Sequence, residues 1–178
     1  MKTNVWRSWR SFLNNKGDNI MNDILFGNLE YNDMQNFCGK VKTSVLGSEE
    51  EVDIMIQAEE ESDEIAEIQR EAFRLFSENE DKLKDEIMEG LLSYYNDELK
   101  YSYGDDEMWQ DIDTTEDMKA QLEWNWIQIP GDYITDDAPV LYLIFHCKWE
   151  DDDPDPQGMA VEITEGSITN IGTAEIAF

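Results

Sequence analysis

The chain has 178 residues, and 42 acidic against 13 basic residues give it a formal net charge of −29. Such a surface repels nucleic acid and anionic membranes and attracts basic proteins and cations, because phosphate binding requires clustered lysine and arginine. Six Trp, seven Tyr and seven Phe exclude a disordered composition, so we expect one folded domain. Both cysteines fall in predicted strands, and no apolar run approaches the about 18 residues of a membrane span, which together favour a cytoplasmic location.

The first 20 residues differ from the rest, because they carry four basic residues and a single acid. Their apolar residues recur at helical spacing (Val5, Trp6, Trp9, Phe12 and Leu13), which predicts a basic amphipathic extension. Such a segment is an anchor on a membrane surface, a helix docked on the acidic body, or a read-through from an upstream start. We assign residues 1–20 to this extension and residues 21–178 to a single domain.

Three strands and then two helices are predicted in the first half of the domain. Residues 23–33 form one strand, and period-2 alternation marks two more within 35–47 and 50–59, joined by a turn at Gly47-Ser48. Ser62 is a suitable N-cap for a first helix that carries an apolar stripe. Ser77 and Glu80 match a capping box, which predicts that a second long helix begins there and runs to about Asp97.

The second half returns to strands after a polar loop and a short helix capped at Thr114 or Thr115. Trp124 and Trp126 alternate in the strand "EWNWIQIP", and "PVLYLIFHCKW" is apolar on both faces, which is typical of a central strand. Two further strands, "MAVEITEG" and "SITNIGTAEIAF", close the chain. The sequence therefore predicts an α+β fold, with an antiparallel sheet of six or seven strands and two long helices packed on one face.

An aspartate-rich loop follows the central strand. Asp151, Asp153, Asp155 and Glu162 have the carboxylate spacing of an EF-hand, but Pro156 stands where that loop needs glycine and both flanks read as strands. The loop is therefore predicted to be a hairpin tip made rigid by two prolines. A Ca²⁺ or small-ligand module that uses residues 150–155 remains an alternative. Its weak metal candidates are Asp151, Asp153 and Asp155.

No pattern in the chain indicates an enzyme. His146 is the single histidine, and adjacent strand residues point to opposite faces, so it cannot form a dyad with Cys147. Zinc requires several His or Cys ligands, which the chain lacks. Phosphate-binding and nucleophile-elbow motifs are absent, and with 42 acids no carboxylate pair stands out. We predict a non-enzymatic protein without a cofactor.

Acid runs recur at loops and strand ends, close in sequence to aromatic residues. Together they form the steering charge and the aromatic anchors of a binding surface for a basic protein. The predicted partner-binding residues are Asp105, Asp106, Asp151, Asp152, Asp153 and Asp155, with Tyr101, Tyr103 and Trp109 as anchors.

Three stretches carry a resemblance to a known family: "FGNLEY…FCGKV", "IQREAFRLFSENEDKL" and "LIFHCKW…QGMAVEI…ITNIGTAEIAF". They resemble a group of small bacterial domains of unknown function, some of them encoded beside polymorphic toxins and regarded as immunity-like. Trp149, Gly158 and "NIG" at 170–172 match positions in the closing hairpin of that group, although "DPDPQG" lacks the histidine often found there. The resemblance implies an immunity protein that neutralises a basic toxin by masking its active site. A structural domain without such a partner is a further alternative.

Overall fold

The computed structural model describes residues 20–102, 109–135, 137–153 and 155–178. Eight strands form one sheet in which each strand lies beside its neighbours in sequence. All pairs are antiparallel except β4 and β5, which are parallel. The strands are β1 (Ile20–Asp23), β2 (Gly27–Tyr31), β3 (Asn36–Thr43), β4 (Glu50–Gln57), β5 (Leu122–Ile129), β6 (Val140–Cys147), β7 (Met159–Thr164) and β8 (Ser167–Thr173).

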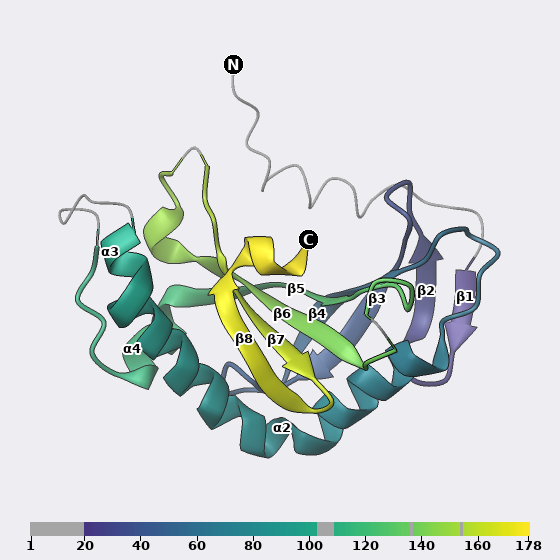
Figure 1. Ribbon diagram of the computed structural model, residues 1–178, viewed down its shortest axis with the longest axis horizontal. Helices are drawn as coiled ribbons and strands as arrows, with labels where there is room; N and C mark the ends of the chain where they lie inside the picture. The colour runs from purple at the N-terminus through teal and green to yellow at the C-terminus, as the bar shows by residue number, and fades with distance from the viewer. Residues whose placement is uncertain (1–19, 103–108, 136, 154) are drawn as a thin grey trace.

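One long helix, α2 (Glu67–Tyr94), covers one face of this sheet and curves around it (Figure 1). It continues through a π-helical turn, η1 (Tyr95–Leu99), into α3 (Lys100–Ser102). After α3 the chain reaches α4 (Thr115–Gln121) and enters β5. The connection from β4 to β5 is thus a helical crossover, which is the kind of connection that a parallel pair requires.

The predicted α+β class is confirmed, but the predicted architecture is wrong in its strand number, its strand directions and its helices. The sheet is eight-stranded and mixed, and the described residues contain one long helix where two were predicted. Ser77 does not cap a second helix, because its hydroxyl donates to the Phe73 carbonyl of the preceding turn at 2.9 Å. The helix also begins later than predicted, at Glu67 and not near Ser62.

The extra strand comes from residues 23–33, which were predicted as a single strand. β1 ends at Asp23, whose Oδ1 accepts hydrogen bonds from the backbone N–H groups of Leu25 (2.8 Å) and Phe26 (3.2 Å). The turn closes at Gly27, where a φ of 72° favours glycine. Of the predicted N-terminal extension, only Ile20 lies within the described residues, and it opens β1.

The buried side chain of Gln69 joins the start of α2 to the sheet. Its Oε1 accepts a hydrogen bond from the Ala66 N–H at 3.0 Å, which satisfies one of the free donors at the helix start. Its Nε2 donates to the Gln57 carbonyl at the end of β4 (2.8 Å) and to the Pro130 carbonyl after β5 (2.9 Å). One amide therefore fixes the helix against both strands of the parallel pair.

The main core lies between α2 and the sheet, and a smaller apolar cluster lies on the other face. The smaller cluster, centred on Met55, Trp126 and Ile144, packs against the C-terminal 3-10 helix η3 (Ala174–Ala177). Trp124 and Trp126 do not alternate regularly, because a β-bulge at Asn125 interrupts the register with β6. Trp124 packs on Phe145 in the main core, with ring centroids 4.7 Å apart, while Trp126 belongs to the opposite face.

Candidate functional site

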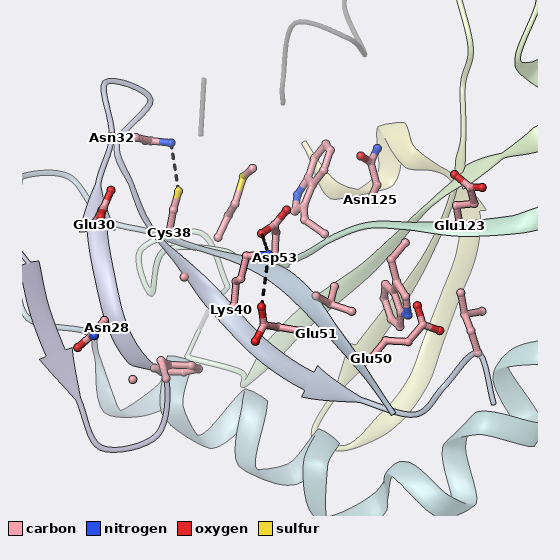
Figure 2. A pocket seen from close by; sticks show the side chains of 18 of the residues that line it. Asn28, Glu30, Asn32, Cys38, Lys40, Glu50, Glu51, Asp53, Glu123 and Asn125 are labelled. Atoms are coloured by element: carbon pink, nitrogen blue, oxygen red, sulfur yellow. Dashed lines mark hydrogen bonds and ion pairs between the residues drawn. The ribbon is translucent and has the colours of Figure 1, made fainter. Parts of the chain in front are cut away.

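A broad hollow of about 1080 Å³ lies along β2, β3, β4 and β5. Figure 2 shows that Cys38, Asp53 and Asn125 rise from the face of the sheet that is turned away from α2. The residues of β3 and β4 alternate here, because Val41 and Ile54 enter the core while Lys40 and Asp53 line the hollow. We call this hollow the sheet groove.

Carboxylates dominate the lining of the sheet groove: Glu30, Glu50, Glu51, Asp53 and Glu123, against Lys40 and Lys119. Lys40 Nζ lies 3.5 Å from Glu51 Oε1 and 3.6 Å from Asp53 Oδ1, so its charge is compensated locally. Lys119 pairs with Glu116 at 2.9 Å. Within the described part of the chain, no lysine or arginine pairs with Glu30 or Glu50. The groove therefore keeps a negative potential that favours a cationic ligand group.

Cys38 and Asn32 line the groove, next to the buried polar side chains of Asn36 and Gln128. Asn32 Nδ2 lies 3.2 Å from Cys38 Sγ, and Gln128 connects Trp126 Nε1 to Asn36 Oδ1 through two contacts of 3.3 Å. Burial, with the nearby Asp53 and Glu30 carboxylates, raises the pKa of the Cys38 thiol to about 12. The thiol is therefore protonated at neutral pH. Because only a thiolate acts as a nucleophile, Cys38 is not activated for nucleophilic attack.

The bulge in β5 leaves two buried donors at the edge of the groove. Trp124 Nε1 and Asn125 Nδ2 have no hydrogen-bond partner among the residues that the structure describes. Sequence reasoning did not single out any residue of the sheet groove. The available signal was the charge alternation in "GKVK" and "EEVDI", which marks a sheet face in contact with solvent.

The predicted partner-binding aspartates of the 151–155 loop lie at another place, after β6. Asp151 Oδ1 lies 2.7 Å from His146 Nε2, and Asp153 Oδ1 accepts a hydrogen bond from the Asp155 N–H at 2.9 Å. Asp152 and Asp155 are exposed. No cluster of three or more metal-ligating side chains occurs in the described ranges, so the aspartates do not converge on one point there.

The loop is held from inside by Glu150, which lies in the short 3-10 helix η2 (Lys148–Glu150). Its buried carboxylate accepts hydrogen bonds from the N–H groups of Gly158 (2.8 Å) and Gln157 (3.3 Å). Burial raises the pKa of Glu150 in spite of these hydrogen bonds, which act in the opposite direction. Glu150 is thus a structural residue that sequence reasoning passed over among 42 acids.

The predicted aromatic anchors divide between the surface and the core. Tyr101 on α3 is 79% exposed, as an anchor must be. Trp109 is partly buried against the main core and meets Tyr95 edge-on, with ring centroids 5.8 Å apart. Tyr103, Asp105 and Asp106 lie outside the described residues. Helix α3 and the segment that follows β6 lie at the same end of the molecule (Figure 1).

None of the helices in the described ranges is both long and apolar enough to cross a membrane. A family model described as "Domain of unknown function (DUF6985)" matches residues 25–178. No curated protein and no solved structure matches the chain. The resemblance to a domain of unknown function is therefore confirmed over nearly the whole described chain, and the description of the family names no activity, partner or toxin.

Proposed function

The chain belongs to the DUF6985 family of domains of unknown function, and on that premise we propose that it is a non-enzymatic binding domain for a basic protein. We further propose the role of a bacterial immunity protein, which acts in the cytoplasm and neutralises a basic toxin by masking its active site. One observation carries this proposal: the sheet groove is open, about 1080 Å³ in volume, and lined by five carboxylates and two lysines.

The net charge of −29 supports the first step of such binding. A charge of this size attracts a basic partner over long distances and accelerates encounter, particularly at low salt. The unpaired carboxylates of Glu30 and Glu50 then offer partners to lysine or arginine side chains of the bound protein. The groove runs across four strands, so it accommodates a segment of a partner protein and not only a single side chain.

The state of the two cysteines supports the non-enzymatic part of the proposal. Burial raises the pKa of Cys147 well above its ordinary value, and the thiol of Cys38 is also held in its protonated form. Neither side chain is thus activated as a nucleophile. His146 faces away from Cys147 and is bound to Asp151.

The proposal is tested with the product of the adjacent gene, produced in bacteria with and without this chain. We expect that product to arrest growth when produced alone, and native chain to restore growth. The variant Glu30→Lys with Glu50→Lys should lose the protection and weaken binding of the purified partner by at least about tenfold. The matched control is Glu78→Lys with Glu89→Lys, which makes the same change of charge at exposed positions of α2.

Two results contradict the proposal. One is an adjacent gene product that is harmless or does not bind the native chain. The other is an equal loss of binding in the groove variant and in the helix variant, because net charge alone would then explain the attraction. Thermal unfolding of both variants checks that they remain folded.

A further inference from the structure

Three loops meet at the end of the sheet where α2 begins. The turn between β2 and β3 is joined to the β4–α2 loop by the Ala58 N–H, which donates to the Gln35 carbonyl at 2.9 Å. Gln35 Nε2 donates in turn to the Glu59 carbonyl at 3.0 Å. The β5–β6 loop is joined to the same place, because the Gly131 N–H donates to Gln57 Oε1 at 3.3 Å. These bonds make the three loops one connected surface.

Large apolar side chains from two of these loops are exposed at this end. Tyr133 and Ile134 are each 55% exposed and Met34 is 40% exposed. We call these three residues the end surface. The Tyr133 ring lies directly against Gly131, where a Cβ atom would clash with it. Single exposed apolar residues are ordinary, but an exposed aromatic residue followed directly by an exposed aliphatic one, with Met34 on a connected loop, has the composition of a binding anchor.

Acidic side chains surround the end surface. Glu59, Glu64 and Asp132 line a hollow of about 190 Å³ together with Tyr133, and Glu60 and Glu61 lie in the same exposed loop. Burial and the nearby charges of Glu59 and Asp132 raise the pKa of Tyr133, which supports their proximity to its ring. Residues 30–39, 44–69 and 122–147, which build this end, contain no lysine or arginine.

We propose that the end surface is a docking site for a basic protein that presents an apolar recess between lysine or arginine side chains. The acidic surroundings decide the chemistry of the occupant, since a second copy of a chain with net charge −29 is repelled. The inference rests on the proposed function, because it takes the partner to be basic. It goes beyond that function by placing the apolar anchors of the interface at the end surface, whose residues do not line the groove.

The end surface is continuous with the sheet groove through Tyr31. This residue lines the groove, and its hydroxyl donates to the Glu59 carbonyl at 3.3 Å. A single partner can therefore place basic side chains in the groove and insert Tyr133 and Ile134 into an apolar recess. Charge supplies attraction in such an interface, and the buried aromatic and aliphatic anchors supply most of the affinity.

Photo-crosslinking in the source cells tests this placement. The photoreactive residue p-benzoylphenylalanine replaces Tyr133 in one variant, Glu50 of the groove in a second, and the exposed Glu89 of α2 in a third. We expect one basic protein to be cross-linked from position 133 and not from position 89. A cross-linked second copy of the chain, an acidic partner, or no cross-linked protein at position 133 overturns the inference.

The same set separates the inference from the proposed function. Cross-linking from position 50 but not from position 133 overturns the inference and leaves the groove proposal standing. Cross-linking from position 133 but not from position 50 overturns the groove proposal and leaves the inference standing. The cross-linked protein is then purified and titrated with Tyr133→Ala/Ile134→Ala, which should bind at least about thirtyfold more weakly. Ile24→Ala, at a fully exposed apolar residue of the β1–β2 turn, is the control, and an equal loss in both variants overturns the inference.

Discussion

The carboxylate of Asp23, at the end of β1, binds the guanidinium group of Arg70 on α2 through two nitrogens. Its Oδ2 lies 2.9 Å from Arg70 Nη2 and 3.2 Å from Nε, and the Asp23 side chain is only 5% exposed. Burial acts to raise the pKa of Asp23, but hydrogen bonds from the Leu25 N–H, from Arg70 and from the Phe26 N–H lower it overall. This ion pair is the side-chain bond that fastens the edge strand to the crossover helix.

Replacing Arg70 should therefore destabilise the protein more than replacing a surface arginine. We expect Arg70→Met to lower the free energy of unfolding by about 2 kcal/mol, because it leaves the Asp23 carboxylate buried without its partner. Arg74→Met is the control, since Arg74 pairs with Glu67 and Glu71 on the helix surface, and it should cost clearly less, because surface ion pairs contribute little. Urea unfolding near neutral pH measures both.

The effect of Arg70 should also depend on pH. A carboxyl group whose pKa is lowered in the folded state contributes stability above its unfolded pKa, and that contribution is lost as the pH falls through the folded pKa. The difference between native protein and Arg70→Met should thus shrink when the pH falls below about 4. A difference that stays constant down to pH 2 would show that the ion pair is not its cause.

Gly158 should tolerate a side chain less well than another glycine with a similar backbone. Gly158 has a φ of 61°, and a Cβ atom there would lie 2.7 Å from the Phe145 carbonyl oxygen. Gly27 has a φ of 72° but open space around the same atom. We expect Gly27→Ala to cost about 1 kcal/mol from backbone strain alone and Gly158→Ala to cost more. Equal melting temperatures for the two variants would contradict this account.

Glu150 should give the stability of the protein a pH dependence opposite to that of the Asp23–Arg70 ion pair. Since its pKa is raised in the folded state, the folded protein binds the proton more readily, and the stability linked to this proton is lost as the pH rises. We compare native protein with Glu150→Gln by urea unfolding across the acidic range. The free energy of unfolding of the native protein, relative to the variant, should fall as the pH rises from about 4 through the folded pKa of Glu150. A relative free energy that increases with pH contradicts the assignment.

Calorimetry with Ca²⁺ separates the alternative ligand module from a structural loop. Asp151 is engaged by His146, and Asp153 is engaged by the Asp155 N–H. We therefore expect the native protein and a variant with all three aspartates changed to asparagine to give equal heats. A larger heat from the native protein would support a cation site in the loop.

Part of the fold was predictable from the sequence, and the errors have physical causes. The helix was divided at Ser77, although the buried face marked by Phe73 and Phe76 resumes in the same helical phase at Leu83 and Ile87. Helical periodicity continues through the polar stretch between Phe76 and Leu83, which is two turns long, so a cap motif alone did not justify a boundary. A long helix between two strands also indicated a crossover connection, and therefore a parallel pairing of the strands before and after it, β4 and β5.

The sheet groove was harder to predict because its residues are distant in sequence. Alternation within β3 and β4 indicated a solvent-facing surface at Lys40 and Asp53, but it did not indicate that β2 and β5 extend this surface into a hollow. The bulge at Asn125 had no sequence signal, since "EWNWIQI" reads as regular alternation. The end surface depends on hydrogen bonds between three loops, which periodicity does not reveal.

The parallel pairing of β4 with β5 has a consequence for the order in which the protein folds. Strands β1–β4 and β5–β8 each form a consecutive meander whose pairings close over short lengths of chain. The two halves meet in the sheet only where Ile54, Met55 and Ile56 lie beside Ile127, Gln128 and Ile129. Closing this contact restricts the long intervening chain, and such distant pairings are slow to form. We expect the halves to collapse early and their joining, guided by α2, to limit the folding rate.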